Sequence, residues 1–368
     1  MNTYIIAGGG TGGHIFPALA LGEAVRRKDP NARVLFAGTR YGLEVQIMAE
    51  RGETLLTLPM RGLLGKSIWQ KAALLWRLPA SLAKAFVLLL KYRPKAVLGV
   101  GGYASIPLAL AASFLRIPVV LQEQNAVAGL ANRLVSRFAR LACLGFPEAA
   151  MQLRCPALVT GNPIRRQFYE LPNWSTERRQ ILILGGSQGA RSLNQHLPAL
   201  LAQVKEIEKY TIVHQAGAQH VSSVEQAYQT VSLSAQVVPF IQDMGAAFAK
   251  SLLILGRAGA STVSEICAAR IPAVLIPFPQ ATHDHQTANA RSLAHFGAAQ
   301  LVKERELDGL VACLNEVLMP DTLRAMHNAF PDQAQPASDW CVDLTNSLVA
   351  GRSVSQLLKE NPVHVSQN

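Results

Sequence analysis

One pattern occurs twice in this sequence and constrains the fold more than any other feature: a short apolar run followed at once by a glycine-rich turn. The run Tyr4–Ala7 precedes GGGTGGH, and the run Ile181–Leu184 precedes GGSQGAR. An apolar strand, a tight glycine turn and a helix open the βαβ units of Rossmann-like folds. The repeat therefore predicts an α/β protein built from two Rossmann-like domains.

Further apolar runs follow both openings, separated by segments long enough for a helix. Such runs are typical of the buried strands of parallel sheets. A chain of 368 residues has room for two domains of this kind. The runs are Val34–Ala37, Ala96–Gly99 and Pro118–Leu121 in the first half, and Tyr210–Val213, Val237–Phe240, Leu252–Leu255 and Ala273–Ile276 in the second.

A polar, proline-containing stretch, Leu171–Thr176, lies between the two halves and is typical of a linker. We therefore expect one domain at residues 1–165 and a second at residues 166–335. Residues 336–368 form a C-terminal segment, in which Trp340–Val349 is predicted to be a short helix.

The formal net charge of +11 favours an anionic partner, which could be a nucleic acid, a phosphate-bearing ligand or an acidic membrane. The cysteines form no CxxC pair, so they predict neither a disulfide framework nor a zinc site. The first residues lack the basic lead and the long apolar core of a secretory signal. These features favour a cytoplasmic protein. The cysteines are Cys143, Cys155, Cys267, Cys313 and Cys341.

One uncharged run, Ala96–Leu115, is about as long as a membrane span. It contains the Gly101-Gly102 pair and Pro107, so we interpret it as a strand, a glycine turn and a helix. A membrane span is the alternative.

The first glycine loop contains G-x-G-x-x-G at Gly8, Gly10 and Gly13, which by itself suggests a dinucleotide site. A nicotinamide-binding domain usually ends its second strand with a carboxylate, and here no acid occurs before Glu44. The backbone N–H groups of the loop, at the start of a helix running from Ile15, suit a phosphate instead. The alternative is that the glycines only let strand and helix pack closely.

His14 directly follows this loop, where a neutral imidazole could accept a proton from a hydroxyl. A purely structural histidine is the alternative. The second loop adds the hydroxyl of Ser187, and a third glycine cluster, Gly99–Ser105, also follows a strand. Because the carboxyl ends of parallel strands meet at one edge of a sheet, these groups indicate sites for phosphate-bearing substrates.

Glu265 lies one turn inside a helix predicted to start in the small residues Gly259–Ser264. Its carboxylate could accept hydrogen bonds from both hydroxyls of a ribose, or could simply lie on a solvated helix face. His283–Gln286 resembles part of a metal site, but further ligands are missing and no Asp-x-Asp occurs in the chain. We therefore predict no metal and no cofactor.

Seven blocks of the sequence resemble, in order, the signature motifs of the MurG family of N-acetylglucosaminyltransferases. They span about residues 4–300 and read GGGTGGHIFPALALGEAV, VLGVGGYASIPLALAA, LQEQNAVAGLANR, TGNPIRR, LGGSQGARSLN, GASTVSE and PFPQATHDHQTANA. The resemblance implies a GT-B fold, with a helix of the C-terminal segment 336–368 crossing back to the first domain. It also implies the inverting transfer of N-acetylglucosamine from UDP-N-acetylglucosamine to undecaprenyl-linked lipid I, which forms lipid II in peptidoglycan synthesis.

The resemblance further implies roles for individual residues, with His14 as the catalytic base. The donor would meet Thr11, Gly12, Gly13, Asn125, Arg165, Ser187, Ile241, Ala260, Ser261, Thr262, Val263, Ser264, Glu265, Gln286 and Asn289. Among these, Arg165 and the Ile241 backbone are assigned to uracil, Ser187 to the diphosphate, Glu265 to the ribose, and Gln286 and Asn289 to the sugar. The acceptor would meet Gly12, Gly13, His14, Gly101, Gly102, Tyr103 and Asn125.

A long stretch from Thr54 through Gln122 contains no acidic residue, while basic residues accumulate there beside large apolar ones. We expect Met60–Lys95 to attach the protein peripherally to an anionic membrane. Helices with ordinary basic faces are the alternative. Together with the resemblance, this implies the cytoplasmic face of the bacterial inner membrane and no nucleic acid partner, and leaves contact with other cell-wall synthesis proteins open. The basic residues are Arg61, Lys66, Lys71, Arg77, Lys84, Lys91, Arg93 and Lys95.

Two other functions fit parts of the sequence. A UDP-sugar 2-epimerase would share the fold and the nucleotide sugar but would need no lipid-linked acceptor. A non-catalytic nucleotide-sugar sensor or membrane scaffold would not need His14. Transfer of labelled sugar to a lipid-linked acceptor distinguishes all three.

Overall fold

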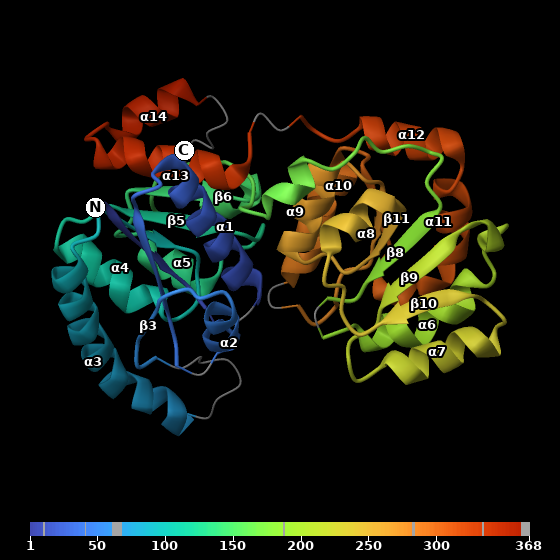
Figure 1. Cartoon of the computed structure of the whole chain (residues 1–368), viewed down its shortest axis with the longest axis horizontal. Helices are drawn as coiled ribbons and strands as arrows, with labels where there is room; N and C mark the ends of the chain where they lie inside the picture. Colours follow the sequence, from blue (N-terminus) through green and yellow to red (C-terminus); the bar gives the residue numbers. More distant parts are fainter. Residues whose placement is uncertain are drawn as a thin grey trace. The chain divides into compact units, whose positions relative to one another are not determined.

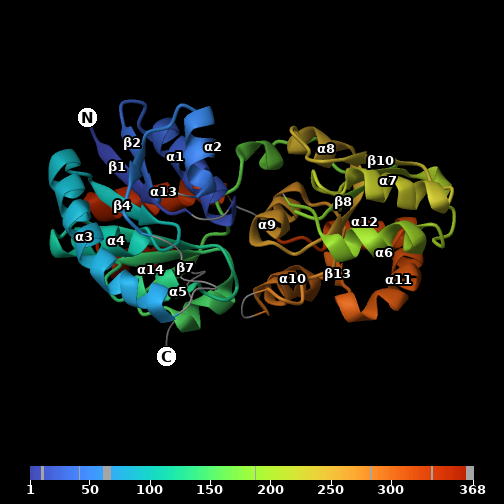
Figure 2. The same ribbon diagram turned by 90° about the horizontal axis from the view of Figure 1, so that it is seen from below.

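The computed structural model describes residues 1–9, 12–40, 42–60, 68–186, 188–281, 284–332 and 335–361; for Leu43 and residues 68–77 it describes the backbone alone. The chain divides into two compact units (Figures 1 and 2). One comprises Met1–Arg165 with Gln335–Asn368, and the other comprises Arg166–Ala334. Within the described residues, no helix is both long enough and apolar enough to cross a membrane.

The first unit contains a seven-stranded parallel sheet in the order β3-β2-β1-β4-β5-β6-β7. The strands are β1 (Thr3–Ala7), β2 (Arg33–Gly38), β3 (Leu55–Thr57), β4 (Ala96–Gly99), β5 (Val119–Glu123), β6 (Leu141–Leu144) and β7 (Ala157–Val159). The helices are α1 (Gly12–Lys28), α2 (Leu43–Glu50), α3 (Ile68–Tyr92), α4 (Ser105–Phe114), α5 (Leu130–Val135), α13 (Ala337–Val349) and α14 (Val354–Glu360), with a 3-10 turn at η1 (Pro147–Gln152).

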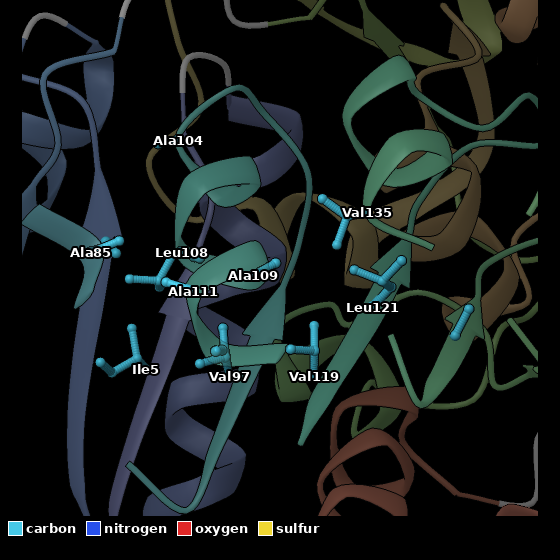
Figure 3. Packing of buried hydrophobic residues seen from close by; sticks show 14 of the residues in the cluster. Ile5, Ala85, Val97, Ala104, Leu108, Ala109, Ala111, Val119, Leu121 and Val135 are labelled. Atoms are coloured by element: carbon cyan, nitrogen blue, oxygen red, sulfur yellow. The ribbon is translucent and has the colours of Figure 1, made fainter. Parts of the chain in front are cut away.

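Alternate residues of these strands pack into two different cores, because successive side chains of a strand point to opposite faces of the sheet. Ile5 and Val97 pack with residues of α3, α4 and α5, including Leu108 and Val135 (Figure 3). Ile6 and its neighbours on that face pack instead with residues of α1, α13 and α14. Both faces are apolar, as expected for a buried parallel sheet.

The C-terminal helices belong to the first unit because they are attached to its first strand and first helix. The hydroxyl of Tyr4 donates a 2.8 Å hydrogen bond to the side-chain oxygen of Asn346. Arg27 at the end of α1 forms an ion pair with Asp339, and Lys28 forms one with Asp343. These two cations also suit the last turn of a helix, where the helix dipole is negative.

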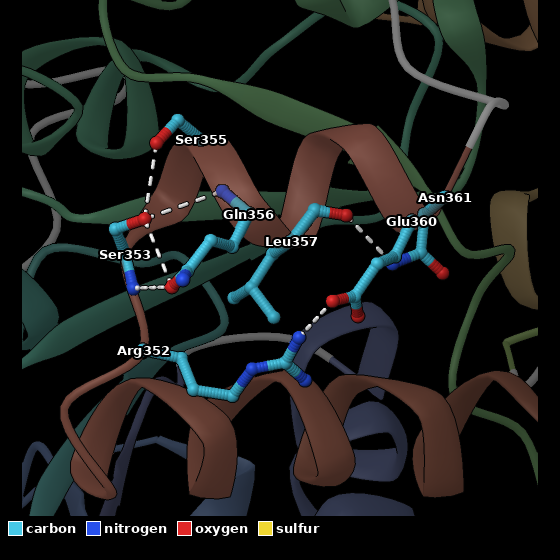
Figure 4. A network of polar contacts seen from close by, with 7 residues as sticks. All are labelled: Arg352, Ser353, Ser355, Gln356, Leu357, Glu360 and Asn361. Carbon is cyan, nitrogen blue, oxygen red and sulfur yellow. Dashed lines mark hydrogen bonds and ion pairs between the residues drawn. The ribbon is translucent and has the colours of Figure 1, made fainter.

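A short helix, α14, ends the described chain, and its local hydrogen bonds explain why it forms there (Figure 4). Ser353 accepts a hydrogen bond from the N–H of Gln356, and the Gln356 side chain accepts one from the N–H of Ser353. This capping box satisfies backbone donors at the start of the helix. Arg352 pairs with Glu360, and buried Leu357 anchors the helix in the core.

The second unit contains a six-stranded parallel sheet in the order β10-β9-β8-β11-β12-β13. The strands are β8 (Gln180–Leu184), β9 (Thr211–Gln215), β10 (Ala235–Val238), β11 (Ser251–Gly256), β12 (Ala273–Leu275) and β13 (Ala299–Leu301). The helices are α6 (Arg191–Leu201), α7 (Val221–Thr230), α8 (Met244–Lys250), α9 (Ala260–Ala269), α10 (His285–His295), α11 (Leu310–Val317) and α12 (Pro320–Asn328), with 3-10 turns at η2 (Arg166–Tyr169), η3 (Ile207–Lys209) and η5 (Glu304–Gly309).

Both sheets change the direction of their strand order beside the first strand of the unit. Chain order runs outward from β1 through β2 and β3 on one side, and resumes at β4 on the other. In the second unit β8 has the same place, between β9 and β11. Ligands of such sheets bind at the carboxyl ends of the strands at this switch point, which is where both predicted glycine loops lie.

Each predicted apolar run coincides with a strand of the structure or lies within two residues of one. Ala96–Leu115 forms β4, a turn and α4, which confirms our interpretation of that run. The run expected at Val237–Phe240 lies two residues earlier, as β10. We did not predict β3, β6, β7, β13 or α14, which have only three to seven residues. The short strands among them depend on the neighbouring strands of their sheets, whereas α14 begins at its own capping box.

Candidate active site

The first site lies at the carboxyl ends of β1 and β4, where two glycine loops meet. Gly102 has a φ of 82°, and a Cβ there would lie 2.6 Å from the carbonyl oxygen of Gly9. Any side chain at Gly102 would therefore push the loops apart. The structure brings predicted residues from separate motifs, Gly101 and Gly102, against the loop that precedes α1.

His14 lies in the first turn of α1, beside this contact. A Cβ placed on Gly101 would lie 2.9 Å from Nε2 of His14, so the ring faces the backbone of the second loop. Burial lowers the pKa of His14, while the carboxylate of Glu123, a hydrogen bond to the Gly9 backbone and the carboxylate of Glu44 act in the opposite direction. Because burial dominates, the imidazole is neutral near pH 7, which is the form that can accept a proton.

Glu44 lies directly beneath the first glycine loop. Its side chain is buried, and its Oε1 accepts hydrogen bonds from the N–H and the hydroxyl of Thr39, at 2.9 and 2.7 Å. A Cβ at Gly9 would lie 2.6 Å from the same oxygen. The sequence indicated only that no acid ends β2; the structure shows that the next acid reaches back under the loop.

Glu123 ends β5 and organises the segment that follows it. Its Oε1 accepts a 3.0 Å hydrogen bond from the N–H of Asn125, and its Oε2 accepts bonds from the N–H of Gly129 and from Nδ2 of Asn132. The side chain of Glu123 is buried, and these donors satisfy its oxygen atoms. Sequence reasoning singled out Asn125 and missed the carboxylate that holds it.

The residues on either side of Glu123 in the sequence, Gln122 and Gln124, belong to a group of buried amides that was also missed. Gln122 donates to the side chain of Asn162, and Asn162 donates to the carbonyl of Gln124. Gln124 in turn donates a 2.8 Å hydrogen bond to the carbonyl of Val100, beside the Gly101-Gly102 loop. A connected polar network of this kind rigidifies the segments that it joins. Three consecutive polar residues at the end of an apolar strand were the available sequence signal.

The second site is the glycine loop after β8, which rests on the end of β9. Gly189 has a φ of 75°, and a Cβ there would lie 1.8 Å from the carbonyl oxygen of Ala216. Only glycine allows this approach. Gln215 lies between the loop and a third segment, because its Nε2 donates to the carbonyl of Gly186 at 2.8 Å and its Oε1 accepts from the N–H of Ile241 at 3.1 Å.

A buried polar group supports the same strand end. His214 contacts the hydroxyl of Tyr228 at 3.0 Å and the side-chain oxygen of Asn194 at 3.1 Å. Asn194, in the first turn of α6, donates to the carbonyl of Ala216 at 2.8 Å. Burial lowers the pKa of His214 to about 4, so this histidine is neutral and structural.

The predicted helix start at Gly259–Ser264 is α9, with Gly259 at its N-cap. Glu265 lies in its second turn and is partly exposed. Within the predicted segment, the side chain of Val263 is buried. This residue could therefore contact a ligand only through its backbone. The partly exposed residues are Ala260, Ser261, Thr262, Ser264 and Glu265.

Gln286 and Asn289 lie in the first turns of α10, and each forms a hydrogen bond with a neighbouring loop. Gln286 accepts a 3.0 Å hydrogen bond from the N–H of Phe278. Asn289 has no exposed surface, and its Nδ2 donates to the carbonyl of Ala258, just before α9. Asn289 thus joins α10 to the start of α9, a structural contact that the sequence did not indicate.

A cavity of about 720 Å³ opens in the second unit between α6, α10 and η5. Its wall carries charges of both signs, and some are already compensated: Arg257 pairs with Glu304, and Thr287 donates to Asp284. The lining residues are Ser192, His196, Pro277, Pro279, Asp284, Thr287, Arg291, Lys303, Glu304, Arg305, Leu307 and Asp308.

Three residues of the predicted motifs, Thr11, Ser187 and His283, lie outside the described residues. Arg165 is the last residue of the first unit before the chain enters the second. Tyr103 is half-buried after Gly102. Across the part of the chain that the structure describes, no three His, Cys, Asp or Glu side chains are placed to hold a metal ion.

The sequence matches known families over both units. Residues 4–143 match the N-terminal domain of glycosyltransferase family 28, and residues 180–340 match its C-terminal domain. A relative from Anaeromyxobacter sp. (strain Fw109-5) is 40% identical over 373 residues, which cover 98% of this chain and 97% of the relative. A relative from Acidithiobacillus ferrooxidans (strain ATCC 53993 / BNL-5-31) is 44% identical over 327 residues, which cover 87% of this chain and 88% of the relative. Both are named UDP-N-acetylglucosamine--N-acetylmuramyl-(pentapeptide) pyrophosphoryl-undecaprenol N-acetylglucosamine transferase.

Solved structures with the same fold include the MurG of Acinetobacter baumannii, at a TM-score of 0.78 and 32% identity, covering 94% of this chain and all of that one. The UDP-N-acetylglucosamine 2-epimerase of Neisseria meningitidis is similar at a TM-score of 0.64 but only 13% identity, covering 95% of this chain. This second likeness shows the fold alone.

Proposed function

The chain belongs to the MurG family of glycosyltransferases, and we propose that it places its catalytic base at the switch point of the first sheet and its nucleotide site at that of the second. The enzyme transfers N-acetylglucosamine from UDP-N-acetylglucosamine to the muramyl sugar of undecaprenyl-linked lipid I and forms lipid II.

His14 is the proposed base, and the observation that carries this assignment is its environment. A hydroxyl of the acceptor sugar is a poor nucleophile until its proton begins to leave. The lowered pKa keeps the imidazole of His14 neutral, and the carboxylates of Glu123 and Glu44 favour the imidazolium that forms when the proton arrives. Attack on the anomeric carbon from the face opposite UDP inverts the configuration and gives a β linkage.

The acceptor site is proposed at the loops around His14. Gly12 and Gly13 directly precede His14 in α1, Gly101 faces its ring, and Gly102 packs against Gly9, so a side chain at Gly101 or Gly102 would disturb these contacts. Asn125 is held by Glu123 at the same edge of the sheet, and half-buried Tyr103 borders the second loop. A sugar bound over these loops would place its hydroxyl within reach of His14.

The donor site is proposed at the second sheet. The loop at Gly186, with Ser187, and the start of α9 supply N–H groups and hydroxyls that suit the diphosphate. The backbone at Ile241, with Arg165, takes the uracil, and Glu265 takes the ribose hydroxyls. Gln286 and Asn289 at the start of α10 lie on the sugar side; since Asn289 is buried, it acts on the sugar through the position of α9.

Peripheral membrane attachment is proposed through the helices α3, α4 and α5. Much of the predicted segment Met60–Lys95, including Lys66, Lys71 and Arg77, has side chains outside the described residues. The described part adds exposed apolar side chains on these three neighbouring helices and beside them, and Figure 2 shows α3 next to α4. Phe114, 85% exposed, stands edge-on to Phe86 of α3. The other exposed apolar side chains are Val87, Leu90, Leu130, Leu134 and Phe138, and exposed cations beside them are Lys91, Arg116, Arg133 and Arg137.

Transfer of labelled N-acetylglucosamine from its UDP derivative to a lipid-linked acceptor tests the proposal. The wild-type protein should form a β-linked product, and EDTA should leave the reaction intact because the proposed chemistry uses no metal. A product of α configuration, or full activity after loss of His14, would refute the assigned mechanism.

A further inference from the structure

The side chain of Gln215 forms two hydrogen bonds that its position in the sequence does not suggest. It ends β9 with only 2% of its surface exposed. Its Nε2 donates to the carbonyl of Gly186 and its Oε1 accepts from the N–H of Ile241. One side chain thus joins the glycine loop after β8 to the segment after β10, and both partners are backbone groups.

We propose that Gln215 is a positioning residue that couples the diphosphate-binding and uracil-binding parts of the donor site. The inference rests on the proposed function, which places the diphosphate at the loop containing Gly186 and the uracil at Ile241. Because both hydrogen bonds go to backbone groups, the amide sets the separation of the two segments whatever side chains they carry.

The chemistry of this position requires a primary amide. A carboxylate could still accept from Ile241 but could not donate to the Gly186 carbonyl, and a thioether could do neither effectively. The amide is also neutral, so it places no negative charge beneath a diphosphate. Glutamine is the shortest side chain that meets both needs here with the observed 2.8 and 3.1 Å contacts.

The residues on either side of Gln215 keep the end of β9 fixed. His214 is held by Tyr228 and Asn194, and Asn194 also holds the carbonyl of Ala216. The contact between Gly189 and Ala216 leaves no room for the loop to move inward. A buried network of this kind makes Gln215 a rigid link between the two segments.

Rigid coupling has a consequence that differs between ligands. UDP uses both segments at once, so it gains from a separation that is already correct before binding. UMP lacks the terminal phosphate and depends less on the glycine loop. Loss of the link should therefore reduce the advantage of UDP over UMP in addition to weakening UDP itself.

The chain offers a matched control at the amino-terminal ends of the strands of the same sheet. Gln180 begins β8, and its Nε2 donates to the carbonyl of Ala247 at 2.8 Å and to the hydroxyl of Ser251 at 2.9 Å. Gln180→Met therefore removes two hydrogen bonds by the same chemical change as Gln215→Met. Its site lies at the amino ends of the strands, away from the proposed nucleotide.

The experiment is calorimetric titration of the full chain with UDP and with UMP. We expect Gln215→Met to weaken UDP binding roughly tenfold, as for the loss of buried hydrogen bonds, and to lower the ratio of the UMP to the UDP dissociation constant. Gln180→Met should leave both values within about twofold of wild type, although it destabilises the fold by a similar amount.

Each outcome bears on a different claim. A wild-type protein that binds no UDP contradicts the proposed function, and with it the basis of the inference. A wild-type protein that binds UDP while Gln215→Met binds both nucleotides normally overturns the inference alone, as does an equal loss for both nucleotides. If Gln215→Met does not fold, Gln215→Asn keeps the amide but is too short to reach both partners, and it should lower the same ratio.

Discussion

The two glycine loops share a backbone design but rest on different supports. The loop after β1 lies over the buried carboxylate of Glu44, whereas the loop after β8 rests on the neutral amide of Gln215. A carboxylate beneath a loop favours a cation above it and opposes an anion, while an amide does neither. We propose from this contrast that the first loop stabilises the imidazolium of His14 and that the second receives the diphosphate.

The largest effect should come from removing the base. We expect His14→Ala to lower kcat by roughly 10²–10⁴ while UDP binds with little change, because only the proton-accepting group is lost. The measurement is steady-state transfer together with UDP titration. His295→Ala, at the exposed end of α10, is the control and should remain near wild type. A parallel loss of UDP binding in His14→Ala would place His14 in the donor site and abolish the contrast.

The donor site proposed in the second unit is tested through the ribose contact of Glu265 in α9. Glu265→Gln should weaken UDP binding by about 1–3 kcal/mol, because an amide cannot accept hydrogen bonds from both ribose hydroxyls as a carboxylate does. Titration with UDP measures the effect. Glu225→Gln, on an exposed position of α7, provides the matched control. Unchanged affinity in Glu265→Gln would move the ribose elsewhere.

The electrostatic influence of Glu123 on His14 can be measured by pH dependence. Glu123 is the larger of the two carboxylate influences that raise the pKa of His14 against burial. Glu123→Gln should therefore lower that pKa further, move the acid limb of the kcat/KM profile to lower pH, and reduce the plateau rate roughly tenfold because the base is weaker. An acid limb that stays in place, or moves to higher pH, would show that Glu123 does not act on His14 electrostatically.

The smallest expected effect concerns the membrane surface, which only the first unit is proposed to carry. Phe114→Asn should weaken binding to anionic vesicles by a few-fold to about tenfold, in line with loss of one buried aromatic side chain. Phe296→Asn, an exposed phenylalanine of the second unit, should have no effect. Equal losses in both variants, or binding that does not weaken with added salt, would contradict the proposed placement.

The sequence predicted the sheets and the loops because their signals are local. Tyr4–Ala7 and Ile181–Leu184 are apolar runs followed by glycines, and both became the central strands β1 and β8. The strands β7 and β13, with three residues each, carry too little pattern to be recognised alone. They form because β6 and β12 offer an open edge beside them.

The supports of the two loops could not be predicted, because they depend on contacts between distant segments. Glu44 was noted only for being too late in the sequence to bind a ribose, and Gln215, two residues beyond the apolar run Tyr210–Val213, gave no signal of its own. Their roles follow from the turn of the chain after β2 and from the pairing of β9 with β8 and β10. A polar residue at a strand end becomes interpretable only once its neighbours in the sheet are known.

The central claim is that the diphosphate binds to the loop after β8, which rests on the amide of Gln215. Exchanging amide and carboxylate at Gln215 and Glu44 tests this claim most directly. UDP titration should show affinity reduced about tenfold or more in Gln215→Glu, where a carboxylate then lies beneath the diphosphate. In Glu44→Gln the affinity for UDP should stay within about twofold of wild type. Thermal unfolding of each variant confirms that folded protein is compared. Weakened UDP binding in Glu44→Gln together with normal binding in Gln215→Glu would contradict the account.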